Sequence, residues 1–296
     1  MSPVLQAVGL SKRYGRRTAL SDCTLVIPPG HVVGLVGPNG AGKTTLLHIA
    51  VGLLEPTAGR IEVLGGRPGS GPAQLARVGF VAQDAPTYRG LSIADHLRFG
   101  AHTNPGWDQQ LAEDRITALG LDRSQKAGKL SGGQRAQLAL TLAIAKRPDL
   151  LILDEPVASL DPLARREFLQ GLMAHVAEHG AGVILSSHLV SDLERVCDYL
   201  IVLLASRVRV AGEVDDLLAS HYRLTGARRD PDGLPTGVEV IEDSHTDRQS
   251  TLIVRSATPI DDPSFTVEQL TLEDLVLAYM SQAAATNPRP AVETAR

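Results

Sequence analysis

Short apolar runs alternate with longer stretches of helical spacing along the first two-thirds of the chain. Residues 32–36, 150–153 and 199–204 are continuously apolar and have the length of buried strands. Residues 44–52 and 165–177 have apolar positions spaced for one face of a helix. Strands that are apolar along their whole length and separated by helices indicate a parallel sheet covered on both faces. The pattern therefore predicts an α/β fold.

A different pattern occupies the middle of the chain. Residues 88–147 have mostly helical spacing, contain no convincing strand and include the loop sequence HTNPGW at 102–107. They predict a helical subdomain inserted into the α/β core.

The composition changes again toward the end of the chain. We expect a small α+β accessory region over residues 216–283, which we call the appendage. Residues 284–296 contain proline and lack periodicity, so they are predicted to form a disordered tail. The predicted elements of the appendage are two antiparallel strands at 237–243 and 248–256 and a helix at 270–280.

Composition narrows the class of protein. The 296 residues are 43% hydrophobic and 3% aromatic, with 28 glycines, which favours an aliphatic α/β core with glycine-dependent turns. The net charge is -4 and no dense block of lysine and arginine is present, so nucleic acid is not an expected partner. Cys23 and Cys197 form no CxxC pair, which argues against a zinc cluster. Because a membrane-spanning helix needs roughly 20 apolar residues, the chain is not expected to cross a membrane.

A glycine-rich loop is the first sequence feature that indicates a specific chemistry. The sequence GPNGAGKTT follows the apolar run at 32–36 and precedes a helical stretch, which is the strand–loop–helix context of a phosphate-binding loop. Its glycines let backbone N–H groups turn toward an anion, and the helix start adds partial positive charge. Lys43 would reach the β and γ phosphates, and Thr44 would give its hydroxyl to Mg2+. The predicted nucleotide-binding residues of this loop are Gly37, Pro38, Asn39, Gly40, Ala41, Gly42, Lys43, Thr44 and Thr45.

Two acids end the apolar strand at 150–153. Asp154 and Glu155 stand at the carboxyl edge of that strand, where ligands bind in such sheets. Asp154 is suited to hold Mg2+ through water, and Glu155 is suited to polarise an attacking water as a general base. Nucleotide hydrolysis is therefore the predicted reaction.

The sequence LSGGQ adds a second anion cradle, because Ser131, Gly132 and Gly133 stand at a helix start. The phosphate loop, LSGGQ and LLILDEP, in this order, resemble the ATP-binding cassette (ABC) ATPases. The resemblance covers roughly residues 4–215 and assigns a cassette to residues 1–215. It implies ATP hydrolysis with ATP and Mg2+ as cofactors. It also implies a P-loop NTPase core with a mixed sheet, an antiparallel β part and an inserted helical subdomain.

The same resemblance implies a shared site. Two subunits of this family dock head to tail, so Ser131, Gly132, Gly133 and Gln134 of one chain would close over the ATP held by Lys43 of the other. A homodimer and a pair with a second cassette both fit this arrangement. Asp161 matches the loop that crosses the interface, although Asp161-Pro162 also has the pattern of a helix start.

Three further residues take roles from the family pattern. Tyr14, ahead of the phosphate loop, matches the aromatic residue that stacks on adenine. Gln83 matches the glutamine that touches Mg2+ and the attacking water. His188 matches the histidine that contacts the γ phosphate. The expected catalytic set is Glu155, His188, Gln83 and Lys43, and the expected metal-binding set is Thr44, Gln83 and Asp154.

The resemblance also implies a partner. LTLEDLVLAYM, at 270–280, resembles the closing helix of cassettes paired with ABC-2 type export permeases, including antibiotic exporters. An amphipathic helix that packs on its own hairpin explains the same spacing equally well. From the resemblance, we expect an ATPase motor subunit at the cytoplasmic face of the cell membrane, where ATP-driven dimer closure powers a separate permease. The segment after Gln83 would help to receive a permease helix. Leu91, Ile93 and Leu97 could equally be buried within the helical subdomain.

Two functions other than transport are known for ABC-type ATPases. A soluble cassette ATPase of DNA repair or translation would usually carry a long coiled coil, two fused cassettes or zinc-binding cysteines, and the sequence has none of these. A cassette that regulates a membrane partner, as in cell division, would have the same ATPase core. The sequence leaves that second alternative open.

Overall fold

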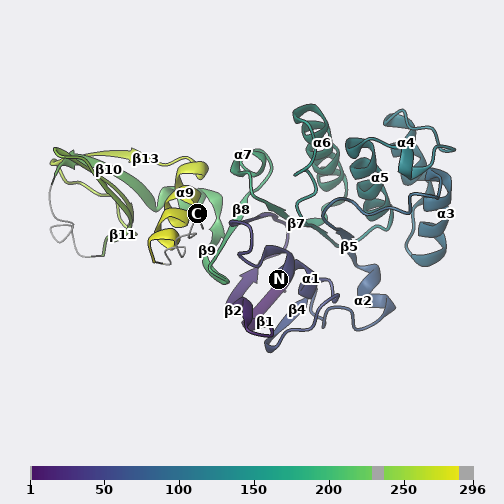
Figure 1. Cartoon of the computed structure of the whole chain (residues 1–296), viewed down its shortest axis with the longest axis horizontal. Coiled ribbons are helices and arrows are strands. Elements are labelled where there is room, and N and C mark those ends of the chain that lie inside the picture. Colours follow the sequence, from purple (N-terminus) through teal and green to yellow (C-terminus); the bar gives the residue numbers. More distant parts are fainter. Residues whose placement is uncertain (1, 229–236, 287–296) are drawn as a thin grey trace, which may run out of the picture.

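This computed structural model describes residues 2–228 and 237–286 (Figure 1). The largest sheet of the described residues has six strands. The five strands from β5 to β8 are parallel, and β9 pairs antiparallel with β8. This mixed sheet confirms the predicted α/β class. The strand order is β5 (Val78–Val81), β6 (Leu150–Leu153), β7 (Gly182–Ser187), β3 (Val32–Val36), β8 (Tyr199–Leu204) and β9 (Arg207–Glu213).

The central strands are covered on both faces. Alternate residues of β6 enter different apolar clusters: Leu151 and Leu153 face one layer, whereas Leu150 and Ile152 face the other. The first layer contains α5 (Gly132–Ala145), α6 (Pro162–His179) and α7 (Val190–Leu193). The second layer contains α1 (Lys43–Ala50) and a separate antiparallel sheet. Double coverage explains why these strands are apolar at every position.

The antiparallel sheet belongs to the first third of the chain. Its strand order is β2 (Arg17–Ile27), β1 (Leu5–Tyr14) and β4 (Ala58–Val63). The short helix α2 (Pro72–Ala76) connects this region to β5. The hairpin of β1 and β2 brings residues from before the phosphate loop to the edge of the nucleotide pocket described below.

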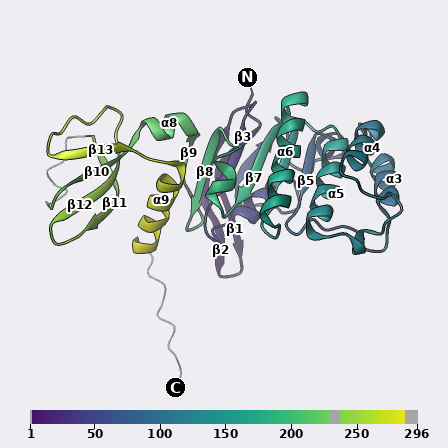
Figure 2. The same ribbon diagram turned by 90° about the horizontal axis from the view of Figure 1, so that it is seen from above.

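The predicted helical subdomain lies at one end of the molecule, with the appendage at the other (Figures 1 and 2). Ile93 and Leu97 are fully buried in the subdomain's own apolar cluster. Their apolar character therefore reflects this core and not a permease contact. Besides α5, the subdomain contains α3 (Ile93–Thr103), α4 (Gln109–Ala118) and η1 (Ala127–Lys129).

The appendage has more strands than the sequence pattern predicts. The two predicted strands correspond to β11 and β12, but β10 and β13 are additional. β13 is an edge strand exposed at four of its five positions, so it lacks a strong apolar pattern. The sheet order is β11 (Glu239–His245), β12 (Gln249–Arg255), β10 (His221–Ala227) and β13 (Phe265–Gln269), and the helices are α8 (Val214–Ala219) and α9 (Leu272–Thr286).

Helix α9 corrects the predicted start of the tail. It continues to Thr286, so the first residues of the segment predicted as disordered are helical. The rest of that predicted tail, 287–296, lies outside the described residues. Within the described part of the chain, no helix is both long enough and apolar enough to cross a membrane.

The appendage shares its core with the cassette. Leu275 and Val276 of α9 are fully buried in the same apolar cluster as Leu193 of α7 and Leu200 of β8. At the start of α9, the Glu194 carboxylate accepts a hydrogen bond of 3.2 Å from the backbone N–H of Glu273. A carboxylate is favourable there because it meets the positive end of the helix dipole. The appendage and the cassette therefore stabilise each other.

We predict that Leu275→Ala lowers the free energy of unfolding by about 2–5 kcal/mol, because it opens a cavity in this common core. Leu277→Ala is a matched control on the same helix, since Leu277 is 50% exposed, and it should cost less than about 0.5 kcal/mol. Urea denaturation followed by circular dichroism measures both. Equal effects of the two substitutions would contradict the shared core.

Candidate nucleotide-binding and hydrolysis site

The phosphate loop connects β3 to α1 and packs closely against neighbouring backbone. Gly42 has a φ of 110°, and a Cβ there would lie 2.3 Å from the carbonyl oxygen of Ala19. A Cβ on Gly37 would lie 2.1 Å from the carbonyl oxygen of Leu203. No side chain fits at these separations, so glycine is required at both positions. The loop is thereby fixed between β2 and the end of β8.

A pocket of about 430 Å³ opens beside this loop. It is lined by Tyr14, by seven of the nine predicted residues of the phosphate loop and by the predicted catalytic residues Gln83 and Glu155. The lining therefore comes from four distant parts of the sequence. Ala19 and Arg17 also line it, and no motif had marked either residue. The lining consists of Tyr14, Arg17, Ala19, Pro38, Asn39, Gly40, Gly42, Lys43, Thr44, Thr45, Gln83 and Glu155.

Tyr14 stands at the rim of the pocket. It is 46% exposed, and the Lys12 Nζ lies over its ring, 5.3 Å from the ring centroid. The Lys12 ammonium also donates a 2.7 Å hydrogen bond to the carbonyl of Glu55. An exposed aromatic ring supported in this way is suited to stack on a flat base.

Asp154 is fully buried behind the pocket at the end of β6. Its Oδ1 accepts a 2.8 Å hydrogen bond from the Ser186 hydroxyl on β7. The Ser186 hydroxyl in turn accepts one of 2.8 Å from the backbone N–H of Glu155. Ser186 therefore fixes both acids, and its only sequence signal was its place two residues before His188.

The second carboxylate oxygen of Asp154 is suited to bind a cation. Within the described residues, Oδ2 is buried and has no hydrogen-bond partner, and a buried unpaired carboxylate oxygen is costly. The described residues contain no group of three or more acidic, histidine or cysteine ligands that could hold a metal. Mg2+ suits such a site, because it is often held by one or two protein ligands together with substrate phosphates.

Glu155 contacts both Lys43 of the phosphate loop and His188, the histidine predicted to contact the γ phosphate. Its Oε1 lies 3.1 Å from the Lys43 Nζ, and its Oε2 accepts a 2.5 Å hydrogen bond from the His188 Nδ1. Glu155 also has a φ of 47°, a strained backbone conformation that needs support from its surroundings. The hydrogen bond to Ser186 supplies part of that support.

The charge state of Glu155 follows from these contacts. Burial raises the pKa of Glu155, whereas the hydrogen bonds from His188 and Lys43 lower it. Together these hydrogen bonds outweigh burial, so the pKa lies below its ordinary value. Glu155 is therefore ionised at neutral pH. The Lys43 ammonium also donates a 2.7 Å hydrogen bond to the carbonyl of Gly37, so the lysine is held at both the loop and the acid.

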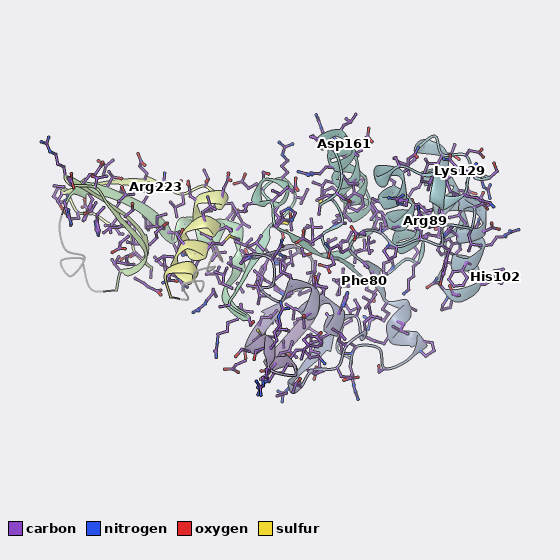
Figure 3. All side chains as sticks on the ribbon, in the orientation of Figure 1. Phe80, Arg89, His102, Lys129, Asp161 and Arg223 are labelled. Atoms are coloured by element: carbon purple, nitrogen blue, oxygen red, sulfur yellow. The ribbon has the colours of Figure 1, made fainter. Side chains whose placement is uncertain are left out.

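The LSGGQ residues lie outside this pocket. Ser131 caps α5: its hydroxyl accepts from the backbone N–H of Gln134 at 3.2 Å, and the Gln134 side chain accepts from the N–H of Ser131 at 3.0 Å. Asp161 caps α6 and accepts from the N–H groups of Leu163 and Ala164 at 3.1 Å (Figure 3). None of Ser131, Gly132, Gly133, Gln134 and Asp161 lines the pocket around Lys43.

Comparison with known proteins identifies the family. The profile of the ABC transporter family matches residues 20–158. A probable ABC transporter ATP-binding protein of Azorhizobium caulinodans is 35% identical, covering 73% of this chain and 79% of its own length. The lipopolysaccharide export ATP-binding protein LptB of Acidithiobacillus ferridurans is 33% identical, covering 74% and 93%. A sulfate/thiosulfate import ATP-binding protein of Agrobacterium fabrum is 32% identical, covering 71% and 63%.

Solved structures have the same fold. An ATP-binding subunit of an ABC transporter is 31% identical, with a TM-score of 0.65, covering 73% of this chain and 92% of that one. The dimeric cassette MJ0796 is 23% identical, with a TM-score of 0.64, covering 71% and 98%, and supports the fold alone. Together with the phosphate loop and the paired acids, these matches show that the chain belongs to the ATP-binding subunits of ABC transporters.

Proposed function

We propose that this chain is the motor subunit of an export-type ABC transporter, in which ATP binding and hydrolysis at the Lys43 pocket drive a separate membrane permease. ATP binding and ATPase activity follow from family membership. The observation that carries the proposed site is the continuous chain of contacts from the phosphate loop through Lys43 and Glu155 to His188. The phosphate loop, the proposed base Glu155 and His188 are thereby in contact with one another.

Binding of ATP exchanges the partners of Lys43. Tyr14 is the platform for adenine, and the loop N–H groups surround the phosphates. The γ phosphate competes with the Glu155 carboxylate for the Lys43 ammonium. When Lys43 turns toward phosphate, Glu155 loses a contact that lowered its pKa, so its pKa rises and it accepts a proton more readily. His188 continues to hold the carboxylate in place.

Mg2+ fits the residues present. Asp154 and Thr44 would hold it, with Gln83 at the same pocket, and it would neutralise charge on the phosphates during bond breaking. Gln83 is exposed and lines the pocket beside Glu155, so its amide can orient the attacking water. Glu155 takes the proton from that water.

Glu155→Gln should reduce ATP turnover at least 100-fold, because a positioned general base contributes about 10²–10⁴ in rate. ATP should still bind, and an ATP-bound dimer should accumulate. Phosphate release and light scattering after size exclusion measure the two effects. Glu167→Gln, an exposed acid on α6, is the control. Normal turnover by Glu155→Gln would remove Glu155 as the base.

The separation of the two cradles supports a shared site. Ser131 and Gly133 do not line the Lys43 pocket of their own chain, yet Ser131 presents the start of α5, a further anion-binding surface. A second copy or a second cassette, docked head to tail, would bring this surface to the γ phosphate. Asp161, at the start of α6, would then lie in the interface.

Mixing Lys43→Ala chains with Ser131→Arg chains should restore ATPase activity above that of either variant alone. Each mixed dimer has one site with an intact lysine and an intact opposing serine, whereas neither homodimer has any. About a quarter of the wild-type rate per dimer is expected after random mixing, because half of the dimers are mixed and each mixed dimer has one of its two sites intact, if each site works independently. Phosphate release at equal total protein measures this. Activity no higher than that of the separate variants would exclude shared sites.

An apolar groove, separate from the Lys43 pocket, supports the proposal that this chain binds a membrane protein. It has a volume of about 390 Å³ and lies between the end of α1, α2, β5 and α5. Leu53 and Leu75 at its rim are 61% and 47% exposed, and Phe80 of β5 lines it (Figure 3). Ala85 and Pro86, just after Gln83, also line it. We propose that a short cytoplasmic helix of the permease inserts here, which would place the chain at the cytoplasmic face of the membrane.

Export and an ABC-2 type permease are the finer parts of this proposal. They are supported by the LTLEDLVLAYM helix and by relatives named for export, such as the Nod factor export protein of Cupriavidus pinatubonensis, 36% identical. A regulatory cassette acting on a membrane partner is the competing function. Transport by the purified complex in vesicles separates the two.

Leu53→Glu should reduce co-purification with the permease at least tenfold, because it places a charge in an apolar contact. Leu277→Glu, a half-exposed leucine on α9, is the control and should co-purify normally. Both variants should keep the thermal midpoint of the wild type, since both leucines are largely exposed. Undiminished co-purification of the Leu53 variant would contradict docking at this groove.

A further inference from the structure

We propose that Arg17 is a second phosphate-binding cation of the nucleotide pocket and that it gives the pocket much of its preference for phosphorylated nucleotides over adenosine. This inference rests on nucleotide binding at the Lys43 pocket, as proposed above. It adds a contact from the β1–β2 hairpin, on a different part of the chain from the phosphate loop.

Arg17 is positioned between the base platform and the loop. It is the first residue of β2 and pairs directly with Tyr14, the last residue of β1. It lines the pocket together with Tyr14. Its Nη2 lies 3.5 Å from the position that a Cβ on Gly40 would take. The guanidinium therefore reaches the middle of the phosphate loop from the strand that also positions the aromatic ring.

The charges in the pocket distinguish Arg17 from Lys43. Both cations line the pocket, but Lys43 is already neutralised by Glu155 at 3.1 Å and donates to Gly37. Over residues 2–228 and 237–286, Arg17 forms neither an ion pair nor a side-chain hydrogen bond. An approaching phosphate can therefore bind the Arg17 charge without first breaking a buried contact.

The guanidinium group suits this position. It is planar and can donate two parallel hydrogen bonds to phosphate oxygens. With adenine on Tyr14 and the terminal phosphates at Lys43, the part of the nucleotide beside Arg17 is the ribose and the first phosphate. Arg17 would thus hold the nucleotide while Lys43 exchanges Glu155 for phosphate. Specificity for a charged nucleotide would arise at two points of the pocket.

The neighbouring Arg16 offers a matched control. It is exposed like Arg17 and has the same charge, but it lies in the turn between the two strands and does not line the pocket. Substituting either arginine by alanine changes the net charge equally. Any difference between the two variants therefore comes from position and not from the overall field of the protein.

Calorimetric titration of the full chain with ADP and with adenosine tests the proposal, since neither ligand is hydrolysed. Arg17→Ala should weaken ADP binding about tenfold, because a charged hydrogen-bonded contact is lost. It should change adenosine binding less than twofold, and Arg16→Ala should leave both affinities within twofold of the wild type. Arg17→Lys should recover part of the loss. The dependence of ADP affinity on salt concentration should also become weaker in Arg17→Ala.

Each contrary result has a distinct meaning. If Arg17→Ala binds ADP like the wild type while Lys43→Ala does not, Arg17 is not a phosphate contact and the proposed function stands. If Arg17→Ala weakens adenosine as much as ADP, the residue supports the Tyr14 platform and the phosphate proposal is overturned. If the wild-type chain binds no ADP, both the nucleotide site and the role of Arg17 are wrong.

Discussion

The buried ion pair between Lys43 and Glu155 is the interaction on which the site depends. The two side chains are only 5% and 8% exposed, so each charge would be strongly destabilising without the other. The pair requires the ends of β3 and β6 to lie close together at the same edge of the sheet. In the strand order, β7 separates them, and parallel pairing brings all three carboxyl ends to that edge. Burial of the ion pair and formation of the central sheet are therefore mutually dependent.

The strand between them, β7, contributes more than spacing. Ser186 on this strand holds Asp154 and Glu155, and His188 immediately after the strand holds Glu155 again. A displacement of β7 relative to β6 would thus disturb Asp154, the proposed metal ligand, and Glu155, the proposed base, together. In the proposed cycle the phosphate of ATP would act on Glu155, because it would compete for the Lys43 ammonium that Glu155 contacts. ATP binding and the basicity of Glu155 would then be linked through the exchange of one ion pair, that of Lys43 with Glu155.

Features that depend only on residues adjacent in the sequence could be predicted from the sequence. The phosphate loop, the paired acids and the apolar strands are each local patterns with a local physical cause. Arg17 and Ser186 were not found, because their significance depends on pairing: Tyr14 with Arg17 in one hairpin, and β6 with β7 in the sheet. Strands β10 and β13 were missed for a similar reason, since their partners are supplied by the appendage sheet. The roles of the site residues stay predictions until they are tested by substitution.

The joint between α7 and α9 has a mechanical consequence. His188 lies just before α7. At the C-terminal end of α7, the Glu194 carboxylate accepts a hydrogen bond from the backbone at the start of α9. A shift of His188 that moved α7 would therefore also have to move α9, whose buried face packs in the same apolar cluster as Leu193 of α7. The appendage would in this way limit how far the segment after β7 can move relative to the central sheet.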